Sequence, residues 1–389
     1  MIHYLRAAKK KNLTGVALVR LDFNTKVGDW RIESVLPTLR LLIKTSRAIV
    51  IMSHYGRPRA EYGLKIKDYG FKSIINNQKS IIKKFSIKKD AGDLARLLKK
   101  KVVFIPHFDF DKIRAQIAAS PRGSIFLLEN LRFIKGEEDN DVRLAKMLAS
   151  LGDFYVNDAF AVSHRADASV AAITRFLPSY VGLELEREII SLSRVMKEPA
   201  RPLVVVLGGA KAGDKLGVLG YFKNKADSIL LGGGCANTML ALRGMDVKKS
   251  LRDMDPKDLR LLAPLSVRHN VIAPIDYVWR NDAILDLGLK SVRDFSKILS
   301  RAKTIIWAGP MGMIDSKRYQ NGSLAVARAI AKNRRAFSLV GGGETVEFLK
   351  ERHLDKKFSF ISTGGGAMLD FLAGEKLPGI EALKKSKRV

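Results

Sequence analysis

The sequence predicts an α/β fold made of two domains, each a parallel β-sheet flanked by helices. Three observations lead to this prediction. Short apolar, β-branched runs recur along the chain and alternate with helix-like segments, which is the pattern of βαβ units. Many of these runs end in a polar or glycine-rich turn. The chain has 389 residues, enough for two domains of ordinary size.

The first half of the chain carries apolar runs that fit buried strands. Continuous apolar runs of this length are typical of strands covered on both faces. They are Val16–Val19, Ile49–Met52, Val102–Ile105, Ile125–Leu128 and Phe154–Val156. Together they are enough for one doubly wound sheet.

The second half repeats this pattern and predicts a second sheet. Its runs are Val204–Leu207, Ile229–Leu231, Val271–Ile275, Thr304–Trp307, Phe337–Val340 and Phe358–Ile361. The halves are expected to divide near Leu177–Val181, where Pro178 interrupts the chain. The amphipathic segment Leu183–Met196 then predicts a helix that joins them. We therefore expect domains at residues 1–180 and 181–372, followed by a C-terminal segment at 373–389 that returns to the N-terminal domain and ends in a basic tail.

Composition limits the class of protein. Hydrophobic residues make up 47% and charged residues 28% of the chain, an ordinary globular balance. The single cysteine, Cys235, excludes an intramolecular disulfide and a zinc site built on paired cysteines. The N-terminus lacks an apolar run of signal-peptide length, and no run of about 18 apolar residues could span a bilayer. We expect a cytoplasmic protein that does not bind membranes.

The formal net charge of +30 is unusual. One interpretation is a solvated basic surface adapted to the interior of the cell. The other is that the partners are anionic, either phosphorylated metabolites or nucleic acid, and charge alone does not decide between them. The basic residues are dense in Lys65–Lys89 and in the tail Lys384–Arg388. The tail is expected to be a solvated end, with weak RNA binding as the alternative.

Glycine-rich turns directly follow the predicted strands of the second half. Glycine lets the backbone approach a ligand closely, and a turn that opens a helix presents free N–H groups to an anion. In open α/β sheets, ligands bind beyond the carboxyl ends of the strands. These turns predict a phosphate-rich ligand, although Asp214 stands where a Walker A lysine would be. The turns are Gly208–Lys211, Gly232–Gly234, Trp307–Gly312, Gly341–Thr345 and Gly364–Gly366.

Polar and basic residues follow the strands of the first half instead. Arginine presents a planar fork of donors that suits phosphate and carboxylate. Several arginines at neighbouring strand ends would converge on one small anion. The segments are Arg20–Asn24, Ser53–Pro58, Glu129–Arg132, Asn157–Phe160 and Ser163–Arg165. An arginine-bearing half and a phosphate-binding half together predict a two-substrate phosphotransferase that closes on its ligands.

These segments resemble those of the phosphoglycerate kinase family, in the family's order and over nearly the whole chain. The resemblance implies two Rossmann-like domains joined by an interdomain helix and a hinge. It also implies reversible transfer of the acyl phosphate of 1,3-bisphosphoglycerate to ADP, giving 3-phosphoglycerate and ATP. The matching segments are Arg20–Asn24, Ser53–Pro58, Leu127–Phe133, Lys135–Glu138, Val156–Phe160, Leu207–Lys211, Ser362–Ala367 and Leu377–Gly379.

The resemblance also implies roles for residues of the first domain. By matching position, Asp22, Asn24, Arg31 and His54 would hold the carboxyl end and hydroxyl of the phosphoglycerate. Arg57, Arg132 and Arg165 would hold its non-transferred phosphate. The substrate residues implied in full are Asp22, Phe23, Asn24, Arg31, His54, Tyr55, Gly56, Arg57, Arg132 and Arg165.

In the second domain the resemblance implies a site for Mg-ADP or Mg-ATP. Asp315 matches the ribose-binding position of the family, and Glu344 matches its metal-associated position. Arg31, Lys211 and the backbone at Gly365 and Gly366 would stabilise the transferring group, without a covalent intermediate. The nucleotide residues implied are Gly209, Lys211, Lys215, Gly288, Asp315, Gly342, Gly343, Glu344 and Thr345.

The sequence departs from the family pattern at several positions. Asn24-Thr25-Lys26 replaces the family's Asn-Val-Pro, Asp167 replaces a histidine, and Ala308 replaces an asparagine beside the nucleotide. Glu344 replaces the metal-associated aspartate, so we expect weaker or altered Mg-nucleotide binding.

Two alternatives to an active monomeric phosphoglycerate kinase stay open at this point. One is a basic pseudoenzyme of the same fold that binds RNA or a protein partner, which the charge and the Ala308 and Glu344 departures favour. The other is a phosphotransferase that acts on a different small carboxylate. The matched arginines and lysines weigh against the pseudoenzyme. The intact set of Asp22, Asn24, His54, Arg57, Arg132 and Arg165 weighs against a different carboxylate.

Overall fold

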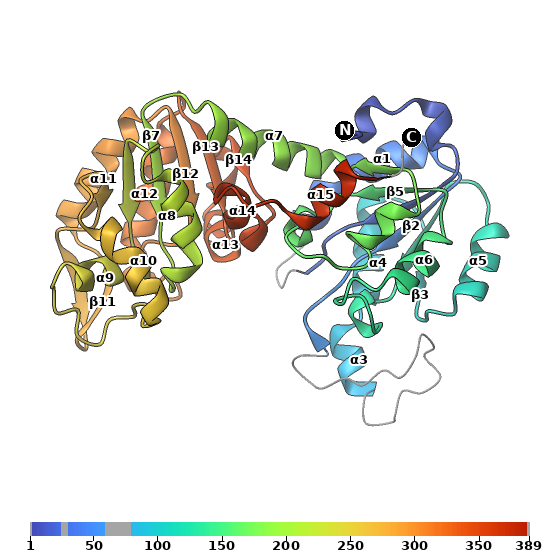
Figure 1. The fold of residues 1–389 in the computed structure, drawn as a ribbon, viewed down its shortest axis with the longest axis horizontal. Helices are drawn as coiled ribbons and strands as arrows, with labels where there is room; N and C mark the ends of the chain where they lie inside the picture. Colours follow the sequence, from blue (N-terminus) through green and yellow to red (C-terminus); the bar gives the residue numbers. More distant parts are fainter. Residues whose placement is uncertain (1, 25–29, 59–78, 387–389) are drawn as a thin grey trace. The chain divides into compact units, whose positions relative to one another are not determined.

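A computed structural model describes residues 2–24, 30–58 and 79–386 of the chain (Figure 1). Its strands form two parallel six-stranded sheets and one two-stranded antiparallel sheet within these residues. The chain divides into two compact units, Met1–Glu188 with Lys376–Val389 and Ile189–Glu375. The predicted α/β fold with two parallel sheets is confirmed.

The first sheet has the strand order β3-β4-β2-β1-β5-β6. The apolar runs of its strands are buried because helices cover the sheet, except in the edge strand β3, where only Ile105 is fully buried (Figure 1). The strands are β1 (Val16–Arg20), β2 (Ala48–Met52), β3 (Val102–Ile105), β4 (Ser124–Leu128), β5 (Phe154–Asn157) and β6 (Ser179–Val181). The helices of this unit are α1 (Trp30–Thr45), α3 (Lys79–Phe85), α4 (Lys88–Leu98), α5 (Phe110–Ala118), α6 (Val142–Ala149) and α15 (Pro378–Lys384).

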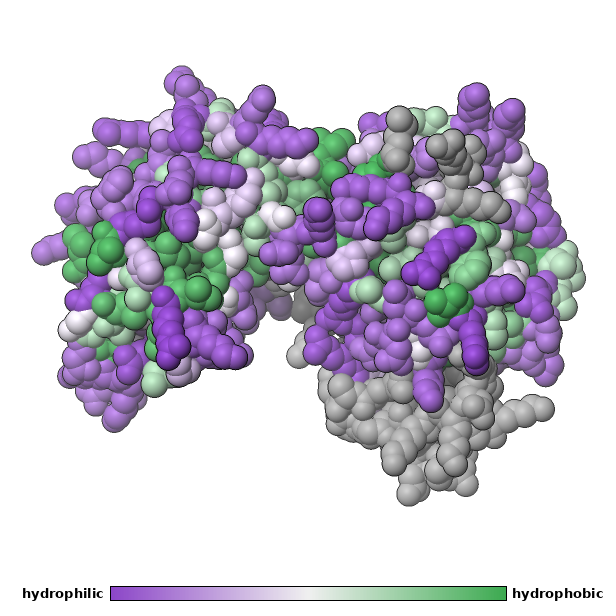
Figure 2. Space-filling model, in the orientation of Figure 1, coloured by the Kyte–Doolittle hydropathy of each residue, from purple (hydrophilic) through white to green (hydrophobic). Residues whose placement is uncertain are grey.

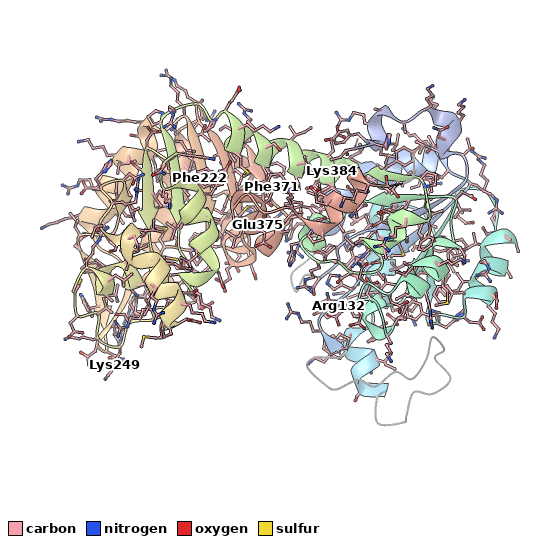
Figure 3. The ribbon with its side chains drawn as sticks, in the orientation of Figure 1. Arg132, Phe222, Lys249, Phe371, Glu375 and Lys384 are labelled. Carbon is pink, nitrogen blue, oxygen red and sulfur yellow. The ribbon has the colours of Figure 1, made fainter. Side chains whose placement is uncertain are left out.

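The second sheet has the strand order β14-β13-β12-β7-β8-β9. Its strands are β7 (Leu203–Leu207), β8 (Ser228–Leu231), β9 (Val271–Ile272), β12 (Thr304–Ala308), β13 (Phe337–Gly341) and β14 (Phe360–Ile361), and the hairpin strands are β10 (Tyr277–Arg280) and β11 (Ala283–Leu287). The helices are α8 (Leu216–Phe222), α9 (Gly233–Leu242), α10 (Pro256–Ser266), α11 (Leu289–Arg301), α12 (Asn321–Lys332), α13 (Gly343–Glu351) and α14 (Gly365–Leu372). Figure 3 labels Phe222 at the end of α8 and Phe371 on α14, elements that contact each other in this unit.

The region of Pro178 differs from the sequence prediction. The residues expected to end the first domain form strand β6, which pairs with β5. Pro178 is tolerated because it precedes an edge strand, where its carbonyl accepts a hydrogen bond from Tyr155 N at 2.9 Å. The expected boundary at residue 180 therefore lies inside β6, and the first unit continues to Glu188.

The joining helix is α7 (Leu183–Lys197), and its start is tied to the first unit. The Oδ1 atom of Asp158, just after β5, accepts hydrogen bonds from the backbone N–H groups of Glu184 and Leu185, both at 2.9 Å. The hydroxyl of Thr38 on α1 accepts one from Leu183 N at 2.9 Å. These acceptors satisfy backbone donors that a helix start leaves unpaired. The start of α7 is thereby anchored to helix α1 and to the segment that follows β5.

The C-terminal helix α15 belongs to the first unit. Gly379 N donates to Ser163 O at 2.8 Å, and the hydroxyl of Thr174 donates to Ala382 O at 3.3 Å. Residues 65–78 of the basic stretch 65–89 lie outside the described residues. So do Thr25, Lys26 and, in the basic tail, Lys387 and Arg388.

Hydrophilic residues cover most of the visible face of each unit (Figure 2). An apolar patch lies on the second unit where α9, α10 and β11 are drawn, and the exposed side chains of this part of the chain include Leu251, Met254 and Leu261. Among the described residues, no helix has the length and apolar character needed to cross a membrane.

Candidate functional site

The functional side chains of the first unit are gathered by the parallel arrangement of its strands. Strands β1, β2, β4 and β5 are neighbours in one sheet, so their carboxyl ends meet at one edge. Asp22 and Asn24 follow β1, and His54 follows β2. Arg132 follows β4, and Figure 3 labels it in this unit. The strand-end residues predicted from the sequence are therefore brought together.

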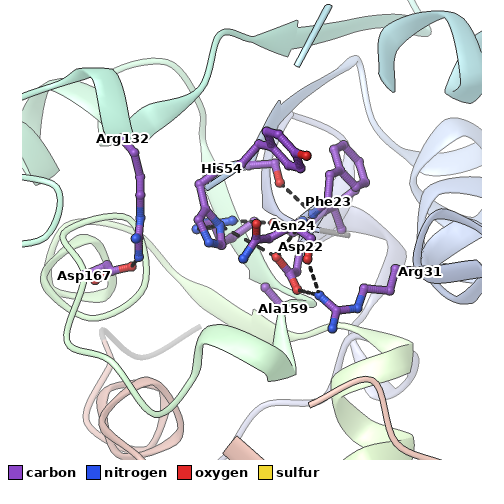
Figure 4. A network of polar contacts seen from close by, with 12 residues as sticks. Asp22, Phe23, Asn24, Arg31, His54, Arg132, Ala159 and Asp167 are labelled. Atoms are coloured by element: carbon purple, nitrogen blue, oxygen red, sulfur yellow. Dashed lines mark hydrogen bonds and ion pairs between the residues drawn. The ribbon is translucent and has the colours of Figure 1, made fainter. Parts of the chain in front are cut away.

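Asp22 organises one side of this site (Figure 4). Its Oδ2 accepts a hydrogen bond from Arg31 Nη1 at 2.6 Å, and its Oδ1 accepts one from Asn24 N at 3.1 Å. Arg31 comes from the first turn of α1 and also donates to the backbone oxygen of Asn24 at 2.9 Å. The guanidinium of Arg31 is thereby held next to the loop after β1.

The loop after β2 is fastened to the loop after β1. Gly56 N donates to Asn24 Oδ1 at 2.9 Å, and Phe23 N donates to the hydroxyl of Ser53 at 3.0 Å. Gly56 has a φ of +63°, and a Cβ there would lie 2.4 Å from the ring of Phe85. Phe23 is buried in the core, while Tyr55 packs with its ring centroid 6.2 Å from that of Phe85. Phe23, Tyr55 and Gly56 therefore shape the two loops.

His54 is buried, with 2% of its surface exposed. Its Nδ1 lies 3.2 Å from Arg20 Nη2, and because a guanidinium nitrogen can only donate, Nδ1 accepts and Nε2 carries the proton. Burial lowers the pKa of His54 well below its ordinary value, and the positive charges of Arg20, Arg132, Arg165 and Arg31 lower it further. The imidazole is therefore neutral and offers one N–H donor.

Three guanidinium groups form the other side of the site. Arg132 is buried, Arg165 is half-buried and Arg57 is exposed. Burial lowers the pKa of Arg165, and the positive charges of Arg132 and Arg57 lower it further. Arg132 is positioned by Asn130, whose Oδ1 accepts from Arg132 N at 3.0 Å. Such a group of positive charges is suited to a phosphate.

A buried polar network supports these residues, and the sequence analysis did not assign it a role. Arg20 Nε donates to the hydroxyl of Ser169 at 2.9 Å, and that hydroxyl donates to Glu137 Oε1 at 2.5 Å. Burial, together with the nearby charge of Asp167, raises the pKa of Glu137 to about 7. Arg20 lies in the motif Arg20–Asn24 and Glu137 in the segment Lys135–Glu138. The resemblance of these two segments to the family was the sequence feature that could have predicted the network.

Three glycine turns of the second unit pack directly on one another. Gly209 N donates to Pro310 O at 2.7 Å, and Gly234 N donates to Gly209 O at 2.8 Å. A Cβ on Gly208 would lie 2.1 Å from Pro310 O, and one on Gly234 would lie 2.0 Å from Ala210 O. These glycines allow the turns after β7, β8 and β12 to meet, so their first role is packing within the protein.

The glycines that open α13 and α14 have a different environment. A Cβ on Gly343 or Gly365 would meet no atom of the described residues within 4 Å. Both stand in the first turn of a helix, where backbone N–H groups have no partner inside the helix. Gly342, before α13, has a φ of +98°. The second unit thus offers two helix starts with open space for an anion.

A pocket of about 230 Å³ lies beside these turns. Three of the predicted nucleotide residues, Gly209, Asp315 and Glu344, line it. Most of the apolar lining was not predicted, because it comes from the hairpin and from the loops around it. Five further lining residues lie in the glycine-rich turns that were predicted to bind a phosphate-rich ligand, namely Ala210, Gly233, Gly234, Pro310 and Gly312. The lining residues outside every prediction are Asn237, Leu251, Ile284, Leu285, Met313 and Ile314.

The remaining predicted nucleotide residues lie around the pocket or away from it. Lys211 is exposed in the turn after β7, and Lys215 follows in a short 3-10 helix. Thr345 is buried in the first turn of α13. Gly288 does not line the pocket. It precedes α11, and a Cβ there would lie 2.3 Å from the carboxylate of Asp276, so packing explains this glycine.

The metal-associated position is held by a carboxylate at a helix start. Glu344 is exposed in the first turn of α13, next to the buried Thr345. Among the described residues, no group of three or more His, Cys, Asp or Glu side chains is arranged to hold a metal ion. This donor set fits an ion such as Mg²⁺ that is held chiefly by phosphate oxygens and water.

Comparison with known proteins adds an independent observation. The family model described as phosphoglycerate kinase matches residues 9–375. The phosphoglycerate kinase of Dictyoglomus turgidum is 35% identical over 395 residues, covering 94% of this chain and 95% of that protein. That of Herpetosiphon aurantiacus is 37% identical over 396 residues, with the same coverage.

Solved structures agree with these relatives. The structure of phosphoglycerate kinase from Coxiella burnetii covers 100% of both chains, with a TM-score of 0.81 and 31% identity. The structure of phosphoglycerate kinase from Pyrococcus horikoshii covers 98% of both chains, with a TM-score of 0.81 and 28% identity.

Glycines packed against backbone and glycines that face open space should respond in opposite ways to substitution by alanine. We expect Gly234→Ala to lower the free energy of unfolding by about 1–3 kcal/mol or more, because its Cβ would collide with a backbone oxygen. We expect Gly365→Ala to raise it by up to about 1 kcal/mol, because alanine is the better helix residue and nothing opposes its methyl group. Denaturant unfolding of the two variants measures both effects. Equal destabilisation would contradict the assignment of Gly365 to a ligand space.

Proposed function

The chain belongs to the phosphoglycerate kinase family, and we propose that its first unit binds the phosphoglycerate while its second unit binds the nucleotide. The reaction is a phosphoryl transfer in which, in the direction that consumes ATP, the carboxyl group of 3-phosphoglycerate is the acceptor. The acyl phosphate of 1,3-bisphosphoglycerate passes to ADP, giving 3-phosphoglycerate and ATP, and the reaction is reversible.

The convergence of Arg57, Arg132 and Arg165 carries the proposal for the first unit. A terminal phosphate bears nearly two negative charges at neutral pH, and three guanidinium groups whose charges act on one another would bind it. The Nε2–H of neutral His54 and the side chain of Asn24 would bind the carboxyl end and the hydroxyl. Asp22 would act chiefly by holding Arg31, which it contacts at 2.6 Å.

The pocket beside the glycine turns supports nucleotide binding in the second unit. Its apolar lining suits a base, and the carboxylate of Asp315 at its edge would accept hydrogen bonds from the ribose hydroxyls. Gly209, Lys211 and Lys215, together with the start of α13 from Gly342 to Thr345, would bind the phosphates. Gly288 would contribute through the start of α11.

Charge stabilisation accounts for catalysis in this proposal. The transferred group carries charge on its equatorial oxygens, so positioned cations and N–H donors lower the barrier. Arg31, Lys211 and the backbone amides of Gly365 and Gly366 would supply them. Transfer requires donor and acceptor to be in line, so we propose hinge closure as the step that brings the two bound ligands together.

Mg²⁺ is proposed as the partner of the nucleotide phosphates. Glu344 would hold the ion, directly or through water, and the ion would neutralise phosphate charge. A single exposed carboxylate beside a helix start is consistent with an ion that the nucleotide brings with it. A cytoplasmic location, a monomeric state and the lack of a specific nucleic-acid partner belong to the same proposal and rest on the family alone.

Removing either charge-stabilising residue should abolish most turnover. We expect Arg31→Ala and Lys211→Ala each to lower kcat roughly 10²–10³-fold, the usual effect of losing one donor to a transition-state oxyanion. The assay follows ADP formation from ATP, Mg²⁺ and 3-phosphoglycerate, coupled to reduction of the acyl phosphate. An exposed cation of the matching unit serves as the control for each variant. Arg40→Ala on α1 is the control for Arg31→Ala, and Lys297→Ala on α11 is the control for Lys211→Ala.

Wild-type turnover that requires 3-phosphoglycerate, collapses in both variants and persists in both controls supports the proposed roles. Full activity in Arg31→Ala or Lys211→Ala would remove that residue from the mechanism. No turnover from folded wild-type protein over a range of Mg²⁺ and Mn²⁺ would contradict the proposed nucleotide site.

Shortening the side chain of Glu344, at the predicted metal-associated position, should strengthen the binding of Mg-ATP. We expect Glu344→Asp to lower the KM for Mg-ATP about two- to tenfold, because the family's shorter carboxylate would meet the ion with less rearrangement. This factor corresponds to the free energy of about one hydrogen bond. The KM for 3-phosphoglycerate should not change. Glu347→Asp, an exposed position on the same helix, is the matched control. A higher KM for Mg-ATP in Glu344→Asp would show that this chain is built around the longer side chain.

A further inference from the structure

Arg132 has an unusual environment for a buried cation. Only 1% of its side chain is exposed, and none of its three guanidinium nitrogens makes a hydrogen bond of good geometry within the described residues. Two carboxylates neutralise it instead. Its Nη1 lies 2.9 Å from Glu138 Oε1, and its Nη2 lies 3.6 Å from Asp167 Oδ2. Figure 4 shows the ends of Arg132 and Asp167 facing each other.

The two carboxylates differ in their freedom to move. The side chain of Glu138 is 33% exposed, so it can turn into solvent when an anion arrives. Asp167 is buried, has a short side chain, and sits in a turn where its backbone oxygen accepts from Val170 N at 2.9 Å and Ala171 N at 2.8 Å. The charge of Asp167 therefore stays beside Arg132 whether or not a ligand is bound.

The charge of Asp167 acts on more than one neighbour. It opposes the lowering of the Arg165 pKa, and it adds to the raised pKa of the buried Glu137. Counted over these side chains alone, the three guanidinium groups of Arg57, Arg132 and Arg165 exceed the two carboxylates of Glu138 and Asp167 by one positive charge. A neutral residue at position 167 would leave about two, which would match a phosphate dianion.

We propose that Asp167 is a built-in counter-ion that competes with the substrate phosphate for Arg132 and Arg165 and so weakens phosphate binding. This inference rests on the proposed function of the first unit. Asp167 acts through the arginines and is a positioning residue, since it repels the phosphate and holds Arg132 in place when the site is empty. It moderates the affinity of a strongly basic protein for its anionic substrate, which favours release.

The test compares Asp167→Asn with the wild type. We expect the KM for 3-phosphoglycerate to fall about three- to thirtyfold, the range for one unit charge several ångströms away at a partly buried site. The KM for Mg-ATP should not change, and the dissociation constant for 3-phosphoglycerate alone should fall by the same factor in calorimetry. Affinity should also weaken more steeply with added salt than in the wild type.

Asp139→Asn, an exposed position on the Glu137–Asn140 loop, controls for the general loss of one negative charge. Asp167→His, neutral at pH 8, is the second variant if the asparagine variant does not fold, and it should show the same fall. An unchanged or higher KM for 3-phosphoglycerate in the folded variants would overturn the inference. Failure of the wild type to use 3-phosphoglycerate would instead overturn the proposed function.

Discussion

Burial of positive charge at the strand ends of the first unit is the constraint on which this site depends. A buried guanidinium is costly unless it is paired and hydrogen-bonded. Arg20 is satisfied by Ser169, by the Leu21 backbone oxygen and by His54, while Arg132 relies on Glu138 and Asp167. Burial, and then the positive charges of the arginines, lower the pKa of His54 and keep it neutral. An incoming phosphate would complete the charge balance that the protein leaves unfinished.

In the proposed function, the second unit would bind phosphate groups in a different way. It presents backbone N–H groups at the starts of α13 and α14 with open space beside them, and it carries Lys211 and Lys215 in the segment after β7. Its glycines divide into two groups, those that let three turns pack and those that leave room for a ligand. In the proposed function, side chains of the first unit bind one small anion, and backbone N–H groups of the second unit bind a polyphosphate. These two kinds of site suit the two substrates of a kinase.

Much of the fold followed from local sequence, and the exceptions have physical reasons. Apolar runs predicted the buried strands, but β6 is an edge strand of three residues after a proline and has no such run. Strand β9 ends at Ile272, shortly before Pro274, which has no N–H to donate, so the predicted run to Ile275 was too long. The hairpin of β10 and β11 was missed, although Asn281 and Asp282, both at positive φ, are a hairpin signal.

The candidate site shows the same limit. Motifs identified Asp22, His54 and Arg132, because these follow predicted strands. They could not identify Ile284 and Leu285, because these residues line the pocket from the missed hairpin. Nor could they distinguish Gly288, which packing requires, from Gly365, which faces open space. The pairing of Asp167 with Arg132 joins two segments far apart in sequence and required the structure.

The protonation of His54 tests most directly whether the arginines converge as described. An NMR pH titration of the imidazole signals, with His54→Gln to assign the resonance among the six histidines, measures it. Our account predicts that His54 stays neutral well below pH 6.5 and that 3-phosphoglycerate shifts its signal at constant pH. Titration of His54 at or above pH 6.5 would contradict it, because that histidine could not be buried among four guanidinium groups.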